Sequence, residues 1–302
     1  MSLVINHNLM AMNATRNLSN AYNSLGVSTR RLSSGLRIGT AADDAAGLAI
    51  RELMRADIAS MNQGIRNAND AISMIQTADG ALGVIDEKLI RMKELATQAA
   101  TGTYTSAQRL IIDSEYQAMA SEITRIAMAT DFNGIKLLDG TLSGAHEGTG
   151  LQSSGDLKIH FGAGNDSAED YYYIRIGAAT ASALGVGFGA RGGTTLAENA
   201  GRSISTQALA QNALDALNAA ITSKDNIRAN LGAMQNRLAN TITNLSIQAE
   251  NLQAAESRIS DVDVAAEMTE FVRNQILTQA AVAMLSQANS LPRMAMQLIQ
   301  GG

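Results

Sequence analysis

The sequence predicts a mainly α-helical protein, a long coiled-coil rod in which the N- and C-terminal halves pack together, with a small β-hairpin region at the centre of the chain. Two observations carry this prediction. Apolar residues recur every seven positions toward both ends of the 302-residue chain, and glycine and aromatic residues gather in the middle. A sustained heptad spacing is typical of helices that supercoil around partners. Aromatic residues between glycine-rich turns favour strands.

The heptad pattern occurs three times along the chain. Leu18, Leu25 and Leu32 stand seven residues apart near the N-terminus. The same spacing continues from Met61 to Ala96 and again from Leu231 to Ile259. We therefore expect helices over residues 43–100, 105–129 and 203–259.

Helix length predicts the shape. A helix over residues 43–100 would be about 85 Å long at 1.5 Å per residue. A compact globule of this chain length has a diameter of about 50 Å. The helix does not fit inside such a globule, so the sequence predicts a rod.

The centre of the chain has a different composition. Fifteen of the 26 glycines lie between Asn133 and Gly201. Within this region, Leu157–Phe161 alternates between apolar and polar residues as a half-buried strand does, and Tyr171–Ile176 follows as its expected partner. The acidic segment between them predicts the connecting loop of a hairpin.

Composition excludes several classes of function. The net charge of −5 offers no basic surface for nucleic acid, and the absence of cysteine removes thiolate sites and disulfides. No apolar run approaches the roughly 18 residues of a membrane span. His146-Glu147 begins a zinc-protease motif, but Gly150 stands where the second histidine belongs. We expect no catalytic site, no metal and no cofactor.

The two terminal segments predict self-association. Residues 1–40 and 262–299 carry apolar residues that short isolated helices cannot bury, and such helices are marginal in water. We expect both ends to be poorly ordered in a monomer and to become helical when packed against each other and against neighbouring copies. The candidate residues for this assembly interface are Leu18, Leu25, Leu32, Met268, Phe271 and Leu285.

Motifs at both ends carry a resemblance to a known family. The N-terminal motifs are Val4–Asn8, Leu32–Ile38 and Ala42–Ile50, and the C-terminal motifs are Ala255–Asp263, Gln275–Ala280 and Met284–Asn289. In this order and at these distances from the termini, they closely resemble the conserved regions of bacterial flagellin. The resemblance covers about residues 1–140 and 200–298.

The resemblance implies a subunit that polymerises into the flagellar filament for swimming motility. Segments 1–42 and 261–302 would form the inner coiled-coil tube, and segments 43–139 and 201–260 the middle helical domain. Segment 140–200 would be the short variable hairpin region that faces solvent. The family also implies secretion through the flagellar type III channel to an extracellular filament. The implied partners are other copies of the chain, an export chaperone, and the filament cap and hook-filament junction proteins.

Recognition by Toll-like receptor 5 is a further implication of the resemblance. Flagellins that this receptor detects present an arginine and a leucine on the long middle helix and a glutamate on the next helix. The matching positions here are Arg91, Leu95 and Glu115. Ile90 replaces a polar residue that often precedes the arginine.

Three alternatives remain open on the sequence. A hook-filament junction protein would share the same end motifs and helical design. An enzyme carried on a flagellin scaffold would need a catalytic group that the short centre lacks. Insertion of the terminal helices into a membrane, which we do not expect to be stable, is the third.

Overall fold

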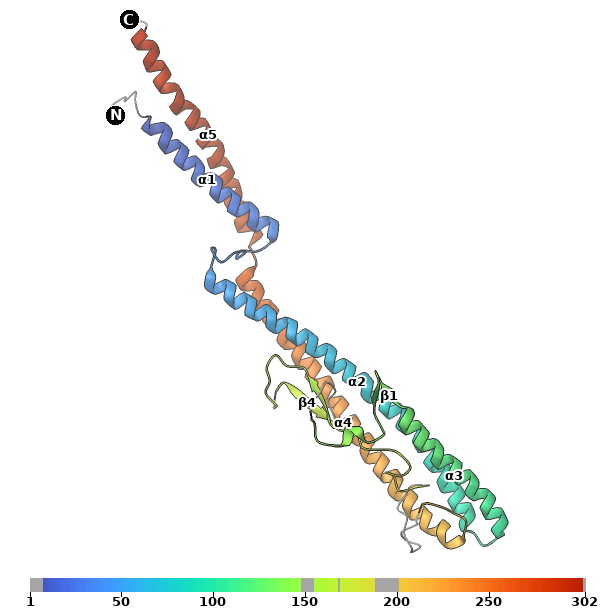
Figure 1. Cartoon of the computed structure of the whole chain (residues 1–302). Coiled ribbons are helices and arrows are strands. Elements are labelled where there is room, and N and C mark those ends of the chain that lie inside the picture. The colour runs from blue at the N-terminus through green and yellow to red at the C-terminus, as the bar shows by residue number, and fades with distance from the viewer. Residues whose placement is uncertain (1–7, 148–154, 168, 188–200, 301–302) are drawn as a thin grey trace. The chain divides into compact units, whose positions relative to one another are not determined.

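The computed structural model describes residues 8–147, 155–167, 169–187 and 201–300 (Figure 1). The first residues of the N-terminal motif, Val4–His7, lie outside them, as do residues 148–154, 168 and 188–200 of the predicted central region and the last two glycines. The described chain is mainly α-helical with a small hairpin, which confirms the predicted fold class. Its helices are α1 (Leu9–Ser34), α2 (Ala45–Ala100), α3 (Ser106–Ala129), α4 (Gln207–Ser260) and α5 (Val264–Gln300). The predicted rod shape stays a prediction.

Local sequence signals explain where the helices begin and end. The Asn8 side chain accepts a hydrogen bond from the main-chain N–H of Ala11 at the start of α1. Thr105 and Gln108 form a reciprocal capping box at the start of α3. Gly35 ends α1 with φ of +71°, a left-handed conformation that glycine adopts without strain.

The chain forms two compact units. One consists of residues 1–58 and 250–302, and the other of residues 59–249. We call them the terminal unit and the central unit. The dividing points lie inside α2 and α4. The segments predicted from the sequence, with boundaries at residues 42, 139, 200 and 260, stay a prediction.

The central unit has one continuous apolar core. It joins buried faces of α2, α3 and α4 to Leu137, Leu138 and Ile176 of the intervening chain. A buried lysine joins α4 to α2 in this unit. The Lys224 ammonium of α4 lies 2.6 Å from the Asp86 carboxylate of α2 and 2.7 Å from that of the neighbouring Asp225. Because a buried charge needs a partner, this contact favours one register of α2 against α4.

Strands β3 (Leu157–His160) and β4 (Tyr171–Ile174) pair antiparallel as the predicted hairpin, with Leu157 opposite Ile174. A second small pair, β1 (Asp131–Phe132) and β2 (Ile135–Lys136), follows α3. The β3–β4 hairpin packs on α4, where the Arg237 guanidinium lies 3.6 Å from the centre of the Tyr172 ring.

The same hairpin contacts α2 through main-chain atoms. Asn67 of α2 donates a hydrogen bond of 2.8 Å to the carbonyl oxygen of His160. The close approach depends on Gly64, because a Cβ at this position would lie 1.9 Å from the carbonyl oxygen of Phe161.

We expect the Gly64→Ala substitution to push the hairpin off α2 and to lower the free energy of unfolding by about 1–3 kcal/mol. Denaturant unfolding measures the loss, and amide exchange in β3 locates it. Gly80→Ala in the same helix is the matched control, because no atom lies within 4 Å of its added Cβ. That control should be stabilising by up to about 1 kcal/mol. Equal changes in the free energy of unfolding for the two substitutions would contradict the close contact between Gly64 and the hairpin.

Candidate self-assembly surface and receptor patch

In the terminal unit, α1 and α5 run antiparallel and side by side (Figure 1). Leu18, Leu25 and Leu32 of α1 are only half-buried, as are Phe271 and Leu285 of α5. The buried side chains of the two helices are small or polar instead: Ser28, Asn274, Thr278 and Ala288. The role of the five half-buried residues in assembly stays a prediction. Met268, the sixth, is exposed.

Hydrogen bonds hold both ends of this helix pair. At one end, the Asn8 side chain of α1 donates a bond of 2.8 Å to the carbonyl oxygen of Ala288 in α5. At the other end, the main-chain N–H of Arg37 donates to Ser260, and that of Val262 donates to Gly35. The register of α1 against α5 is thereby set at both ends.

Asp43 organises the connection between α1 and α2. Its carboxylate accepts hydrogen bonds from the main-chain N–H and the hydroxyl of Thr40, at 3.0 and 2.9 Å, and lies 3.1 Å from Arg30 of α1. The Thr40 hydroxyl makes the largest contribution to lowering the pKa of Asp43 below its ordinary value, and Arg30 adds to it. The connection is therefore stabilised by the ionised form of Asp43.

The outward faces of α1 and α5 carry many large apolar side chains. Each of these aliphatic, thioether or aromatic side chains is at least 44 % exposed to solvent. We call this exposed set the outward apolar face, although four of its members, Leu9, Met10, Leu277 and Met284, line the groove between the two helices. Its members are Leu9, Met10, Met12, Tyr22, Val264, Met268, Val272, Ile276, Leu277, Val282, Met284 and Met294. Sequence reasoning missed most of them, because they lie off the heptad positions that it followed.

Arg91 and Glu115, two of the predicted receptor residues, meet on the surface of the central unit. The Arg91 guanidinium on α2 donates hydrogen bonds of 3.0 and 2.8 Å to one carboxylate oxygen of Glu115 on α3, and one of 2.9 Å to Glu94. Glu115, and then Glu94, raises the pKa of Arg91 above its ordinary value. About half of each side chain remains exposed.

Leu95, the third predicted receptor residue, is 1 % exposed and belongs to the core of the central unit. It lies one turn after Arg91, on the side of α2 that the core covers. The structure therefore brings Arg91 and Glu115 together and places Leu95 beneath the surface, where it supports α2.

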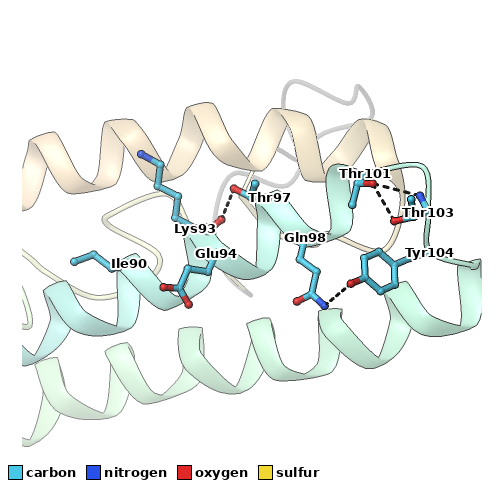
Figure 2. Close-up of a pocket in the computed structure, with 8 residues that line it drawn as sticks. All are labelled: Ile90, Lys93, Glu94, Thr97, Gln98, Thr101, Thr103 and Tyr104. Atoms are coloured by element: carbon cyan, nitrogen blue, oxygen red, sulfur yellow. Dashed lines mark hydrogen bonds between the residues drawn. The ribbon is translucent and has the colours of Figure 1, made fainter.

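An open hollow of about 680 Å³ lies beside Arg91, lined by Ile90, Lys93, Glu94, Thr97, Gln98, Thr101, Thr103 and Tyr104. Figure 2 shows that its polar groups bond to one another: Gln98 donates to the Tyr104 hydroxyl, and Thr101 contacts Thr103. The lining contains no histidine and one carboxylate, that of Glu94, which accepts a hydrogen bond from Arg91.

The described residues lack two kinds of feature. They contain no cluster of three or more histidine or acidic side chains placed to hold a metal ion. None of their helices is both long enough and apolar enough to cross a membrane.

Comparison with known proteins identifies the family. Residues 5–143 match the model of the bacterial flagellin N-terminal helical region, and residues 214–299 match that of the C-terminal helical region. The chain belongs to the bacterial flagellin family. Flagellins are structural proteins and not enzymes, so family membership supports a structural subunit of the flagellar filament.

Relatives match this flagellin over nearly its whole length. A flagellin of Halalkalibacterium halodurans is 42 % identical over 99 % of this chain and 100 % of its own. The flagellar filament 33 kDa core protein of Treponema phagedenis is 40 % identical over the same shares. The solved structure of a putative flagellar hook-associated protein from Vibrio parahaemolyticus covers 72 % of this chain and 100 % of its own, with a TM-score of 0.55 and 14 % identity. That likeness shows the fold alone.

We expect Asp43→Asn to lower the thermal stability of the terminal unit at pH 7. The folded-state pKa of Asp43 is lowered, so its stabilising effect is present above its ordinary pKa of about 3.9 and is lost as pH falls through the folded-state value. The difference in melting temperature between wild type and variant should therefore disappear in acid. Circular dichroism melting from pH 7 to pH 2 measures it, and a constant difference across this range would refute the role of the charge.

Proposed function

We propose that this flagellin polymerises by burying the outward apolar face of α1 and α5 against neighbouring copies, and that the resulting filament serves swimming motility. The observation that carries the proposal is the size of this face on only two helices. Each large apolar side chain contributes about 1.5–3 kcal/mol when fully buried. Several such contacts per subunit suffice to offset the cost of ordering and association.

The six residues of the sequence-based interface have two roles in this proposal. Leu18, Leu25, Leu32, Phe271 and Leu285 hold α1 to α5, so that the outward face is presented on a formed helix pair. Met268 belongs to the outward face itself. An exposed residue such as Ile276 is therefore the sharper position at which to test association.

We also propose that the subunit is secreted through the flagellar type III channel and acts outside the cell. Its partners would be an export chaperone, the filament cap and the hook-filament junction proteins. Family membership supports this proposal. The absence of cysteine supports it as well, because a chain without thiols cannot be cross-linked before it passes through a narrow channel.

Toll-like receptor 5 is a proposed partner of the free subunit, with Arg91 and Glu115 as contact residues. Their joint exposure on α2 and α3 supports this proposal. Because Arg91 is already held by two carboxylates, its guanidinium is oriented before a partner arrives, which reduces the entropy lost on binding. Leu95 acts from the core by fixing the helix that carries Arg91.

We expect Ile276→Asp to abolish elongation while leaving the helical content of the monomer unchanged, because Ile276 is 59 % exposed in the free chain. Seeded polymerisation, followed by sedimentation and electron microscopy, measures elongation. Ile276→Leu keeps an apolar side chain and should elongate normally. Normal filaments from the aspartate variant would refute the assignment. Wild-type chain that never elongates on seeds would favour the junction protein instead.

We expect the double substitution Arg91→Ala with Glu115→Ala to reduce the response of a Toll-like receptor 5 reporter at least about tenfold in potency, a loss of about 1.4 kcal/mol. The assay uses soluble monomer. Arg125→Ala with Glu122→Ala is the matched control, since it removes another exposed arginine–glutamate pair from α3. An unchanged response to the first variant would remove the two residues from the receptor site.

A further inference from the structure

Methionine is the only sulfur-containing residue of the chain, with 14 methionines and no cysteine. Among the described side chains, six methionines are strongly exposed. Five of them, Met10, Met12, Met268, Met284 and Met294, lie on α1 and α5, and the sixth is Met128 on α3. Exposed thioether sulfur is therefore concentrated on the two helices of the outward apolar face.

Met10 and Met284 occupy the same groove. This groove, of about 860 Å³, runs between α1 and α5 and is also lined by Leu277 and Ala281. Met10 is 51 % exposed and Met284 is 64 % exposed. In contrast, Met74 and Met92 are sealed in the core of the central unit.

We propose that Met10 and Met284 are oxidation sites at which a peroxide controls the association of free subunits. The proposal rests on the polymerisation proposed above. In the reaction with hydrogen peroxide, the thioether sulfur attacks one oxygen, and an S–O bond forms as the O–O bond breaks. The proton on the transferred oxygen passes to the departing hydroxide, so the products are methionine sulfoxide and water. Sulfur loses two electrons and the peroxide gains them. No thiol of the same chain competes for the oxidant.

The sulfoxide opposes association because it turns an apolar contact into a strongly polar one. A buried sulfoxide oxygen needs a hydrogen-bond donor, and an apolar neighbouring surface supplies none. In the free subunit, water can donate to it. Oxidation therefore stabilises the free subunit relative to the assembled one, and association in turn shields the sulfur from peroxide.

The first test needs no variant. Free wild-type chain is treated with hydrogen peroxide until it carries about one sulfoxide on average, and is then polymerised on untreated seeds. Mass spectrometry of the digested pellet and supernatant gives the sulfoxide fraction at each methionine. We expect sulfoxide at Met10 and Met284 to be about tenfold depleted from the pellet, and sulfoxide at Met128 to divide evenly. An even division at all three positions overturns the proposal.

The second test uses matched variants. Met10→Leu with Met284→Leu keeps both side chains apolar and should retain more polymerisation after peroxide treatment than wild type, although Met12, Met268 and Met294 stay oxidisable. Met128→Leu should lose polymerisation as wild type does. Equal loss in both variants overturns the proposal. Reduction of oxidised wild type by sulfoxide reductases for both epimers should restore elongation, and failure to do so while the sulfoxides disappear also overturns it. If untreated wild type does not polymerise, the failure lies with the proposed function and not with the oxidation sites.

Discussion

The long helices of this protein are stabilised by packing against one another, because most helical stability comes from burying an apolar face. Each long helix therefore depends on a partner that the chain supplies from far away in sequence. In the terminal unit, α1 finds its partner in α5, and in the central unit α2 and α3 share a core with α4. Apolar contacts provide the free energy of these pairings, while Lys224 and the hydrogen bond from Asn8 fix their registers.

The heptad spacing was sufficient to predict the helices because it is local information. Expected ranges of 43–100, 105–129 and 203–259 correspond to helices over Ala45–Ala100, Ser106–Ala129 and Gln207–Ser260. The alternation of Leu157–Phe161 and the tyrosines after it likewise predicted the hairpin. The contact between the hairpin and Gly64 could not be predicted from the sequence. It depends on where the main chain at Phe161 lies in space, and no local pattern around Gly64 indicates this.

The candidate sites were harder to predict than the fold. A heptad leucine such as Leu25 signals that it will be buried, but not whether the same chain or another copy covers it. Ile276 does not lie at a heptad position, so the spacing of apolar residues does not predict that it takes part in assembly. Leu95 lies four residues after Arg91, a spacing that predicts that both side chains lie on one exposed face of the helix. In the structure, Arg91 is exposed and Leu95 lies in the core.

The hydrogen bond from Asn8 to Ala288 spans 280 residues. Closing so large a loop has a high entropic cost before any contact repays it, and non-local pairing slows folding. During synthesis, α1 emerges before α2, α3 and α4, and its partner α5 emerges after them. Helix α1 thus stays without its partner until α5 has left the ribosome, and the terminal unit can close only then.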